Sequence, residues 1–307
     1  MGGYVVRRLV QMVPVFIGAT LLIFLMVNVM GDPIAGLCGE RRCDPATAAQ
    51  LEREFGLDKP VWQQYLTYMG NVFTGDFGTA FNGQEVTELM ATSFPVTIRL
   101  TLIAILFEIV VGVTLGVVTG LRRGRPVDTG VLLLTLVVIS VPTFVTGLLL
   151  QLLLGVKWGW IRPSVSSEAP FDELILPGLV LASVSLAYVT RLTRTSIAEN
   201  RRSDYVRTAI AKGLPRHRVV VRHLLRNSLI PVVTFIGADI GFLMGGAIVT
   251  ERIFNIHGVG YQLYQGILRQ NTQTVVGFVT VLVLVFLVAN LVVDLLYAVL
   301  DPRIRYD

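Results

Sequence analysis

Residues 191–231 read RLTRTSIAENRRSDYVRTAIAKGLPRHRVVVRHLLRNSLIP, and this stretch differs from the apolar sequence on both sides of it. It contains ten Lys and Arg, opposed only by Glu199 and Asp204. The ten are Arg191, Arg194, Arg201, Arg202, Arg207, Lys212, Arg216, Arg218, Arg222 and Arg226. Because so basic a segment crosses a bilayer with difficulty, we expect a cytoplasmic loop between two membrane spans.

The first half of this loop predicts a short helix with defined ends. Ser203 and Asp204 are residue types that commonly cap helix N-termini, so the helix is expected to start near Tyr205. Lys212 would lie in its last turn, and Gly213 can adopt the left-handed conformation that ends many helices. The loop therefore begins with a compact unit rather than a flexible connection.

The second half of the loop predicts another helix. Pro215 stops the first helix and can open the second, because its missing N–H has no partner at a helix N-terminus anyway. Arg218, Arg222 and Arg226 follow at four-residue spacing and would form one basic stripe. The helix is expected to end towards Pro231.

The rest of the chain is strongly apolar. Hydrophobic residues make up 53% of the 307 residues and charged residues only 15%. With a mean hydropathy of +0.67, this composition excludes an ordinary soluble globular protein. Crossing a bilayer takes about 20 apolar residues, and six runs approach or exceed that length. They cover residues 9–30, 97–121, 127–154, 174–190, 231–250 and 274–300.

We therefore predict an all-α membrane protein with six transmembrane helices and both N- and C-termini in the cytoplasm. This topology places 17 of the 26 Lys and Arg on the cytoplasmic side, in agreement with the positive-inside rule. The first run could instead belong to a cleaved signal peptide, since Arg7 and Arg8 precede it. It is long for such a peptide, and Asp32-Pro33 is not a small-residue cleavage site, so we expect a retained span.

Residues 31–96 form the longest polar region and lie outside in this topology. Asp44 and Pro45 fit the N-cap and first position of a helix that ends at Gly56. Pro60 opens a second helix, and a short helical run is expected over residues 85–93. The second helix carries an apolar stripe at i, i+3, i+4 and i+7, made of Trp62, Tyr65, Leu66 and Met69.

No segment predicts chemistry on a bound substrate. The chain lacks the glycine-rich sequence that holds ATP phosphates, so ATP hydrolysis would need another chain. No nucleophile–base pair or metal-ligand spacing is present, and we expect no catalytic residue, metal or cofactor. Cys38 and Cys43, both in the outer region, could form a disulfide in an oxidising exterior or remain free thiols.

Two acidic residues lie near the middle of predicted spans, Glu108 in the second and Asp239 in the fifth. An isolated charge there costs at least ~2.5–3.5 kcal/mol, so each must face protein or water, or be protonated. They could contact a substrate's amino end in a pathway, or simply hydrogen-bond to a neighbouring helix. Pro142, which follows Val141 in the third span, can kink that span and is a candidate flexing point.

Glycines recur at four-residue spacing in two of the spans. The second span contains Gly112 and Gly116, and the fifth contains Gly237, Gly241 and Gly245. This spacing allows helices to approach closely. It fits packing within one subunit as well as helices that line a pathway between two subunits.

The basic loop resembles a known element of membrane transporters. Residues 204–214 (DYVRTAIAKGL) and 223–231 (HLLRNSLIP) are similar to the coupling loop of ABC-importer permeases, in the form found in dipeptide and oligopeptide permeases. The wider family begins this loop with Glu-Ala-Ala, where this chain has Arg207-Thr208-Ala209. The acidic first residue is therefore absent. Charge alone would also fit a cytoplasmic loop with no docking role.

Similarity to the same family extends to both ends of the chain, over residues 4–9, 31–33 and 290–297. It implies the fold of a type I ABC importer-like permease. Residues 1–30 would be the N-terminal region and first span, and residues 31–96 an extracytoplasmic helical scaffold loop. Residues 97–307 would form the core permease domain, including the coupling loop at 191–230.

The resemblance implies a non-catalytic subunit, the first of two homologous permeases in an ATP-driven importer of short peptides. The cytoplasmic membrane of a prokaryote would hold it. Its other implied partners are two ATPase subunits (or one fused chain) that bind ATP and Mg, and an extracytoplasmic substrate-binding protein; nucleic acid is not expected. The implied mechanism is alternating access. ATPase docking would use Asp204, Tyr205, Arg207, Thr208, Ala209, Lys212 and Gly213.

Two alternatives remain open from the sequence. Other branches of the family carry nickel complexes or glutathione. A stand-alone secondary transporter or channel is a different class, in which Glu108 and Asp239 could relay protons. Against that class, the six spans show no evident inverted repeat, and such a protein has no need of a docking unit.

Overall fold

The structure is a computed structural model that describes residues 2–30, 44–54, 56, 58–80 and 83–300. These residues are mostly helical, and the one β-bridge among them joins Thr79 and Glu85. The chain forms two compact units. One contains residues 1–97 and 255–288, and the other contains residues 98–254 and 289–307.

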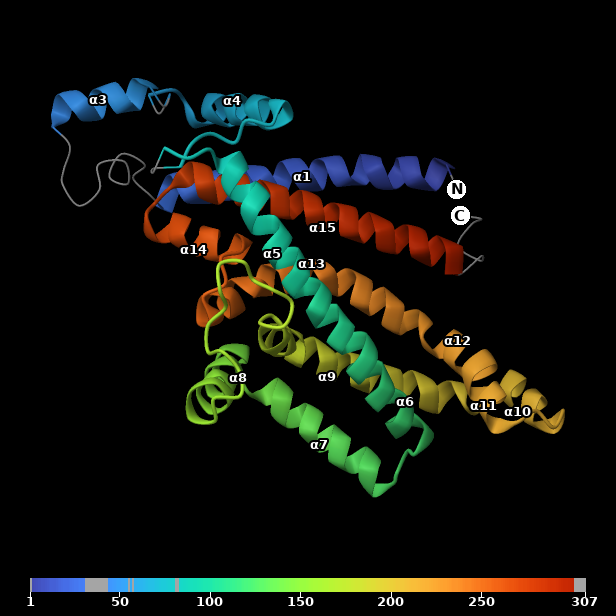
Figure 1. Cartoon of the computed structure of the whole chain (residues 1–307). Helices are drawn as coiled ribbons and strands as arrows, with labels where there is room; N and C mark the ends of the chain where they lie inside the picture. The colour runs from blue at the N-terminus through green and yellow to red at the C-terminus, as the bar shows by residue number, and fades with distance from the viewer. Residues whose placement is uncertain (1, 31–43, 55, 57, 81–82, 301–307) are drawn as a thin grey trace. The chain divides into compact units, whose positions relative to one another are not determined.

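The helices are labelled in Figure 1. Their bounds are α1 Gly2–Met30, α3 Pro45–Glu54, α4 Val61–Thr74, α5 Val86–Phe107, η1 Glu108–Gly112, α6 Val113–Leu121, α7 Pro126–Ser140, α8 Thr143–Leu150, η2 Gln151–Lys157, α9 Ile175–Asn200, α10 Asp204–Ala211, α11 Arg216–Arg218, η3 Val219–Leu225, α12 Arg226–Ser228, α13 Ile230–Phe254, α14 Val259–Leu268 and α15 Thr272–Leu300. The three segments labelled η are π-helical turns.

Among the described residues, five helices are long and apolar enough to cross a membrane. They are Val5–Val27, Val86–Leu121, Ile175–Asn200, Ile230–Phe254 and Thr272–Leu295. A sixth span results only if α7 and α8–η2 count as one, because the two parts are bent by 100°. The described chain therefore has five or six spans.

Two predicted span boundaries are wrong. The fourth span was expected to end at Thr190, but α9 continues to Asn200. Residues 191–200 are therefore helix and not loop, since polar and apolar side chains of this segment alike are buried within the protein. The helical run predicted at 85–93 is not separate from the second span, because α5 runs unbroken from Val86.

The expected kink at Pro142 is a complete break. Val141 (φ −95°, ψ 124°) and Pro142 (φ −55°, ψ 137°) are both extended, and α8 starts afresh after them. Proline has no N–H for a helical hydrogen bond, and it disfavours helical geometry at the residue before it. Hydropathy across residues 127–154 is continuous, so the break is not visible in the apolar pattern.

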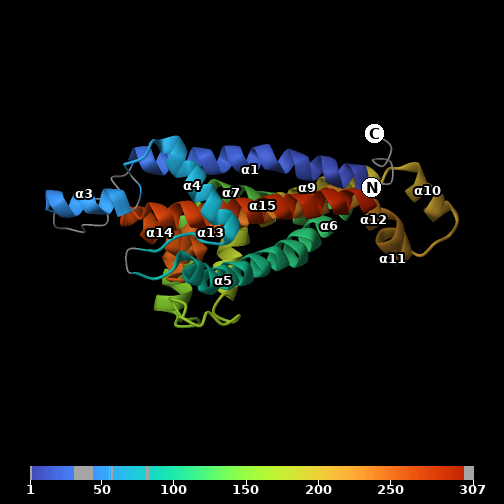
Figure 2. The same cartoon turned by 90° about the horizontal axis from the view of Figure 1, so that it is seen from above.

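In the first unit, α1, α4 and α15 share a small core. Phe24, Tyr65, Met69 and Val276 are buried together, and α1 runs beside α15 in both views (Figures 1 and 2). The Tyr65 hydroxyl lies 2.9 Å from the Thr20 hydroxyl. Tyr68 and Thr280 are linked in the same way at 2.8 Å, and burial raises the pKa of Tyr68 to about 12.

The predicted stripe on α4 is only half correct. Tyr65 and Met69 are buried, but Trp62 is 65% and Leu66 60% exposed. The helix turns the face containing residues 65, 68 and 69 towards its neighbours instead. Helix α14, between α13 and α15, was not predicted at all.

In the second unit, α9 is the central helix and packs against α6, α7, α8 and α13. Glycines allow α6 to approach it closely. A Cβ at Gly116 would lie 2.4 Å from Thr193 Cβ, and one at Gly120 would lie 2.7 Å from Ile197 Cβ. The predicted close-packing face of the second span is therefore confirmed, and its partner is α9 of the same chain.

The glycines of the fifth span divide into two kinds. A Cβ at Gly237 would lie 2.3 Å from Val293 Cγ2 on α15, so this glycine permits a close helix contact. Gly245 has no described atom within 4 Å of the corresponding position. Gly245 therefore makes no close helix contact within the described part of this chain, and a contact with a second subunit stays a prediction.

The connection between η2 and α9 is held by Glu173. Its carboxylate accepts the Ser166 N–H at 2.7 Å and forms an ion pair with Arg162. The pKa of the Glu173 carboxyl lies below its usual value. The hydrogen bonds with Ser166 are the largest cause, and the Arg162 charge lowers the pKa further.

Candidate functional site

Helix α10 begins one residue earlier than predicted, at Asp204. Ser203 occupies the N-cap position, and its carbonyl accepts the N–H groups of Val206 and Arg207 at 3.1 Å each. No side-chain hydrogen bond caps this end. The capping expected from the Ser203 and Asp204 side chains is therefore wrong, and the Asp204 carboxylate faces Arg207 at 3.9 Å instead.

The C-terminus of α10 is closed as predicted. Gly213 has φ +74°, the left-handed geometry that a residue with a Cβ adopts at a cost. The Gly213 N–H donates to Ile210 O at 2.9 Å and the Leu214 N–H to Ala209 O at 3.3 Å. This pair of bonds is a Schellman motif, and Leu214 packs on the cluster that contains Ala209, as the motif requires.

One face of α10 is packed against α9 and η3. Val206 and Ala209 are 2% and 4% exposed, and they share a buried cluster with Ile197, Val219 and Leu224. Ala209 was expected on the outward face of the helix, and that expectation is wrong. Ala209 is part of the core between α10, η3 and the end of α9.

The other face of α10 is exposed. It presents Tyr205 (37% exposed), Ile210 (60%) and Arg207 (side chain 72%). Thr208 and Lys212 are exposed on the same helix, and the Tyr205 hydroxyl donates to Asn200 Oδ1 at 2.8 Å. Ile210 was missed from the sequence, since an apolar residue in a short helix is normally assigned to the core.

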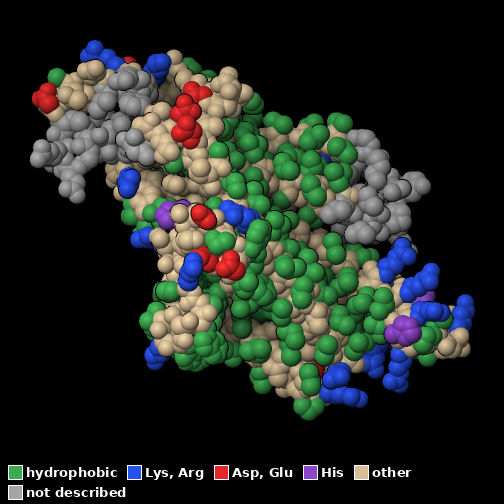
Figure 3. Space-filling view, in the orientation of Figure 1, with side chains coloured by type: hydrophobic (Ala, Val, Ile, Leu, Met, Phe, Trp, Pro, Cys, Tyr) green, Lys and Arg blue, Asp and Glu red, His purple; other side chains and the backbone are tan. Residues whose placement is uncertain are grey.

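The second predicted helix of the loop is present, and its middle is a π-helical turn. Residues 216–228 form α11, η3 and α12, and a separate helix, α13, starts at Ile230. The three basic residues predicted as a stripe, Arg218, Arg222 and Arg226, lie in α11, η3 and α12 in turn. All three are exposed, and basic side chains gather at the end of the second unit that carries α10 and α11 (Figure 3).

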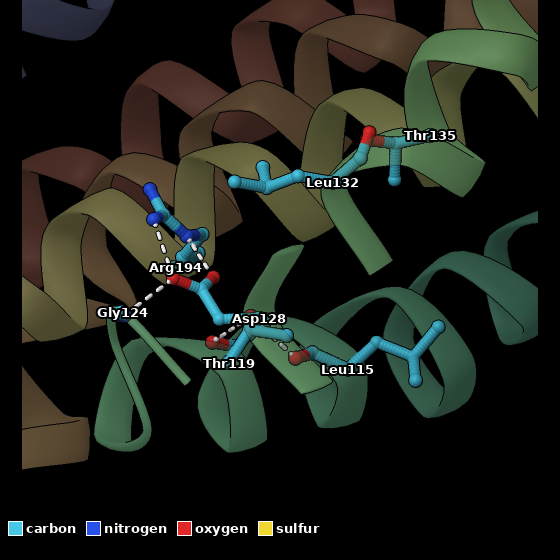
Figure 4. A network of polar contacts seen from close by, with 8 residues as sticks. Leu115, Thr119, Gly124, Asp128, Leu132, Thr135 and Arg194 are labelled. Carbon is cyan, nitrogen blue, oxygen red and sulfur yellow. Dashed lines mark hydrogen bonds and ion pairs between the residues drawn. The ribbon is translucent and has the colours of Figure 1, made fainter. Parts of the chain in front are cut away.

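Two polar contacts tie the end of α9 to its neighbours, and neither was predicted. The Arg194 guanidinium binds both oxygens of Asp128 in α7, with Nε–Oδ1 2.5 Å and Nη2–Oδ2 2.8 Å (Figure 4). Asp128 Oδ2 also accepts the Gly124 N–H at 2.9 Å. On another side of α9, the Ser196 hydroxyl donates to Ser228 O at 2.8 Å.

Glu108 and Asp239 are brought together inside the second unit. Glu108 is 0% and Asp239 8% exposed, and their carboxyl groups lie close enough to interact, with Ser185 beside Asp239. Among the described residues, neither oxygen of Glu108 has a hydrogen-bond partner. Both acids thus avoid lipid by facing protein, and their role in a pathway stays a prediction.

Two further predictions concern other parts of the chain. Pro142 lies at the break between α7 and α8, and a flexing role for it stays a prediction. Cys38 and Cys43 lie outside the described residues. Within the described part of the chain, no group of three or more acidic, His or Cys side chains could hold a metal ion.

Family models match almost the whole sequence. Residues 112–306 match the binding-protein-dependent transport system inner membrane component, and residues 1–101 match the N-terminal part of the same kind of component. The first match contains all of the loop described above. Together they leave only ten residues between them, within α5 and η1.

Several bacterial proteins are similar over their full length. The di/tripeptide transport system permease protein of Pseudomonas aeruginosa is 38% identical, with 99% of each chain covered. The dipeptide transport system permease protein of Escherichia coli K12 is also 38% identical, over 99% of this chain and 98% of that one. The glutathione transport system permease protein of Salmonella choleraesuis is 36% identical over 99% of each chain.

Proposed function

Because the chain belongs to the family of binding-protein-dependent transport system inner membrane components, we propose that it is the first of two permease subunits in an ATP-driven importer of short peptides. Its full-length similarity to permeases named for dipeptides and di/tripeptides supports the choice of solute. The secondary-transporter alternative has no support from these relatives.

The observation that carries the proposal is the construction of α10. One face is buried in the cluster with Ile197, Val219 and Leu224, and Ile210 is exposed at the edge of that face, near Arg207. An exposed apolar side chain within a polar rim is typical of a protein-docking surface. The Schellman motif at Gly213 fixes the end of this surface. We assign this exposed surface to an ATPase subunit.

The packing of α10 provides a route by which ATPase movement reaches the membrane spans. ATP binding closes two ATPase subunits, and α10 moves with the one to which it is docked. Because Val206 and Ala209 share a buried cluster with η3 and with Ile197 of α9, that movement passes into α9 and from there to the spans around it. The spans then alternate between inward- and outward-facing states. ATP and Mg stay on the ATPase subunits, and this chain contributes neither a catalytic residue nor a cofactor.

The proposal includes a membrane topology. The chain is a multi-pass inner membrane protein, and we assign it six spans with α7 and α8–η2 as a broken third span. Both termini lie in the cytoplasm. The exposed basic residues on α10 to α12 and at 122–125 support this orientation, because such residues stay on the cytoplasmic side. An extracytoplasmic binding protein delivers solute to the opposite side.

One comparison also favours glutathione as the transported solute. Glutathione is itself a tripeptide, and the glutathione permease relative is nearly as similar as the dipeptide permeases. Transport should therefore be measured with a panel that contains a dipeptide, a tetrapeptide, glutathione and a nickel chelate. We expect the dipeptide to be taken up fastest.

The test uses the complete complex: this chain, its partner permease, the ATPase subunits and the binding protein, reconstituted in vesicles. We expect ATP-dependent dipeptide uptake by the wild type. Ile210→Asp should leave the two permeases assembled but weaken ATPase binding, because it places a charge in the apolar centre of the docking face. Ile210→Val should behave as wild type.

Gly213→Ala provides a second perturbation with a matched control. Gly213 and Gly159 both have positive φ (+74° and +62°) and no described atom within 4 Å of an added Cβ. Replacing either glycine with alanine therefore introduces about the same backbone strain, roughly 1 kcal/mol. We expect lost coupling only for Gly213→Ala. Equal uptake per ATP in Gly213→Ala, Ile210→Asp and wild type would refute a docking role for α10.

A further inference from the structure

The cytoplasmic end of α9 is held from three directions. Ile197 packs into the core under α10, Ser196 bonds to the Ser228 carbonyl of α12, and Arg194 binds Asp128 of α7. Arg201, just after α9, adds a hydrogen bond from Nη1 to the carbonyl oxygen of Leu121, the last residue of α6, at 2.7 Å. All of these residues belong to the same compact unit.

The Arg194–Asp128 pair is the strongest polar link in this set. It is bidentate, and the side chains are only 17% and 3% exposed. Bidentate Arg–carboxylate contacts fix orientation as well as distance. Asp128 lies in the first turn of α7, and its third bond, from the Gly124 N–H, anchors the turn that precedes the helix (Figure 4).

The position of Asp128 matters because of where α7 ends. Helix α7 stops at Ser140, and the next helix is bent by 100° relative to it. A helix separated from its continuation by extended residues can pivot as a rigid piece. The pair therefore adds a fixed polar link between the first half of the third span and α9, against which α7 also packs.

We propose that Asp128 and Arg194 are positioning residues that make α7 follow the movement of α9 when α10 is displaced. This inference rests on the proposed transport function and extends it to residues outside the docking loop. Without the pair, α10 and α9 still move together through the cluster that contains Ile197, but α7 follows less closely, because only packing then links it to α9. ATP hydrolysis then continues while less solute is carried for each ATP.

A purely structural role makes a different prediction. If the pair only stabilises the fold, its loss lowers the amount of assembled complex, and uptake and ATP hydrolysis fall together. If it transmits movement, assembled complexes hydrolyse ATP but transport poorly. The ratio of solute taken up to ATP hydrolysed separates the two roles.

The experiment compares Asp128→Asn, Arg194→Gln and Arg194→Lys in the reconstituted complex, after gel filtration has isolated assembled material. We expect the uptake-to-ATP ratio to fall about fivefold or more in the first two, the lower range of coupling between distant sites. Arg194→Lys keeps the charge but not the bidentate geometry, and should give an intermediate ratio. Arg191→Gln, an exposed charge on the same helix, should leave it unchanged.

A labelling measurement makes the result independent of the transported solute. A cysteine at Val127, 44% exposed beside Asp128, is introduced after both native cysteines are changed to serine. A non-hydrolysable ATP analogue should alter its maleimide labelling rate in the otherwise wild-type complex but not with Arg194→Gln. A nucleotide response preserved in Arg194→Gln, or an unchanged uptake-to-ATP ratio, would overturn the proposal. Absence of ATP-driven uptake in the wild type would count against the proposed function instead.

Discussion

Gly116→Ala tests the close contact between α6 and α9. The new Cβ would lie 2.4 Å from Thr193 Cβ and 2.7 Å from the Thr190 carbonyl oxygen. Carbon atoms in proteins pack best at about 3.5–4.0 Å. Rotating Thr193 moves neither its Cβ nor the backbone oxygen, so α6 and α9 have to separate by roughly 1 Å. That separation also loosens the neighbouring contact at Gly120.

Overpacking of this kind destabilises proteins by about 1–3 kcal/mol. One kcal/mol corresponds to a melting-temperature change of about 2–4 °C in chains of 150–250 residues, so we expect a loss of several degrees. The matched control is Gly245→Ala, where no described atom lies within 4 Å. Alanine is favoured over glycine in helices by roughly 0.5–1 kcal/mol, so this control should melt at or above the wild-type temperature.

The assay is thermal unfolding of the purified permease pair in lipid nanodiscs. A rescue experiment sharpens it. The three atoms nearest to a Cβ added at Gly237 all belong to the Val293 side chain, so adding Val293→Ala to Gly237→Ala should restore most of the stability. Adding Thr193→Ala to Gly116→Ala should not, because the Thr190 oxygen remains. Equal melting of Gly116→Ala and Gly245→Ala would refute the packing of α6 on α9.

Three other predictions concern single polar groups. Tyr68→Phe should lower the free energy of unfolding by about 1–3 kcal/mol, because it leaves the buried Thr280 hydroxyl without this partner; adding Thr280→Val should recover most of the loss in thermal unfolding. Glu173 has a lowered pKa in the folded chain, so its stabilisation is complete above its ordinary value of 4.5 and disappears as pH falls through the folded value. Melting curves of wild type and Glu173→Gln should therefore differ at pH 6 and converge in acid. Glu108→Gln should keep assembly and melting temperature, since an amide of the same size removes an ionisable group from a fully buried site; a large drop would show that the acid itself is needed.

Local sequence signals predicted the features that depend on a few neighbouring residues. Gly213 takes the left-handed conformation because only glycine does so freely after Lys212. Pro142 interrupts a helix because its ring removes a donor and restricts Val141. Helix α3, from Pro45 to Glu54, follows its proline start as expected.

Features that depend on distant residues could not be predicted in this way. Asp128 and Arg194 are 66 residues apart, and each looks like an ordinary charge at the edge of a span. The hydropathy pattern predicted that the fourth span ends at Thr190, because the charged residues Arg191 and Arg194 follow. Tertiary contacts instead keep α9 helical to Asn200. Ala209 was assigned to the wrong face for the same reason, since the neighbour of a short amphipathic helix is set by the fold.

The break at Pro142 also constrains the order in which the protein can mature. The Gln151 side chain donates to Pro163 O at 2.6 Å and to Ile253 O at 2.9 Å. Ile253 is synthesised about a hundred residues later, so the bent form of residues 126–157 lacks this support while the chain is still on the ribosome. We expect the nascent segment to be interrupted at Pro142 from the start but to take its full 100° bend only when α13 arrives. Glycosylation mapping of a chain truncated before Ile230 should then place residue 157 farther from the membrane centre than it lies in the full-length protein.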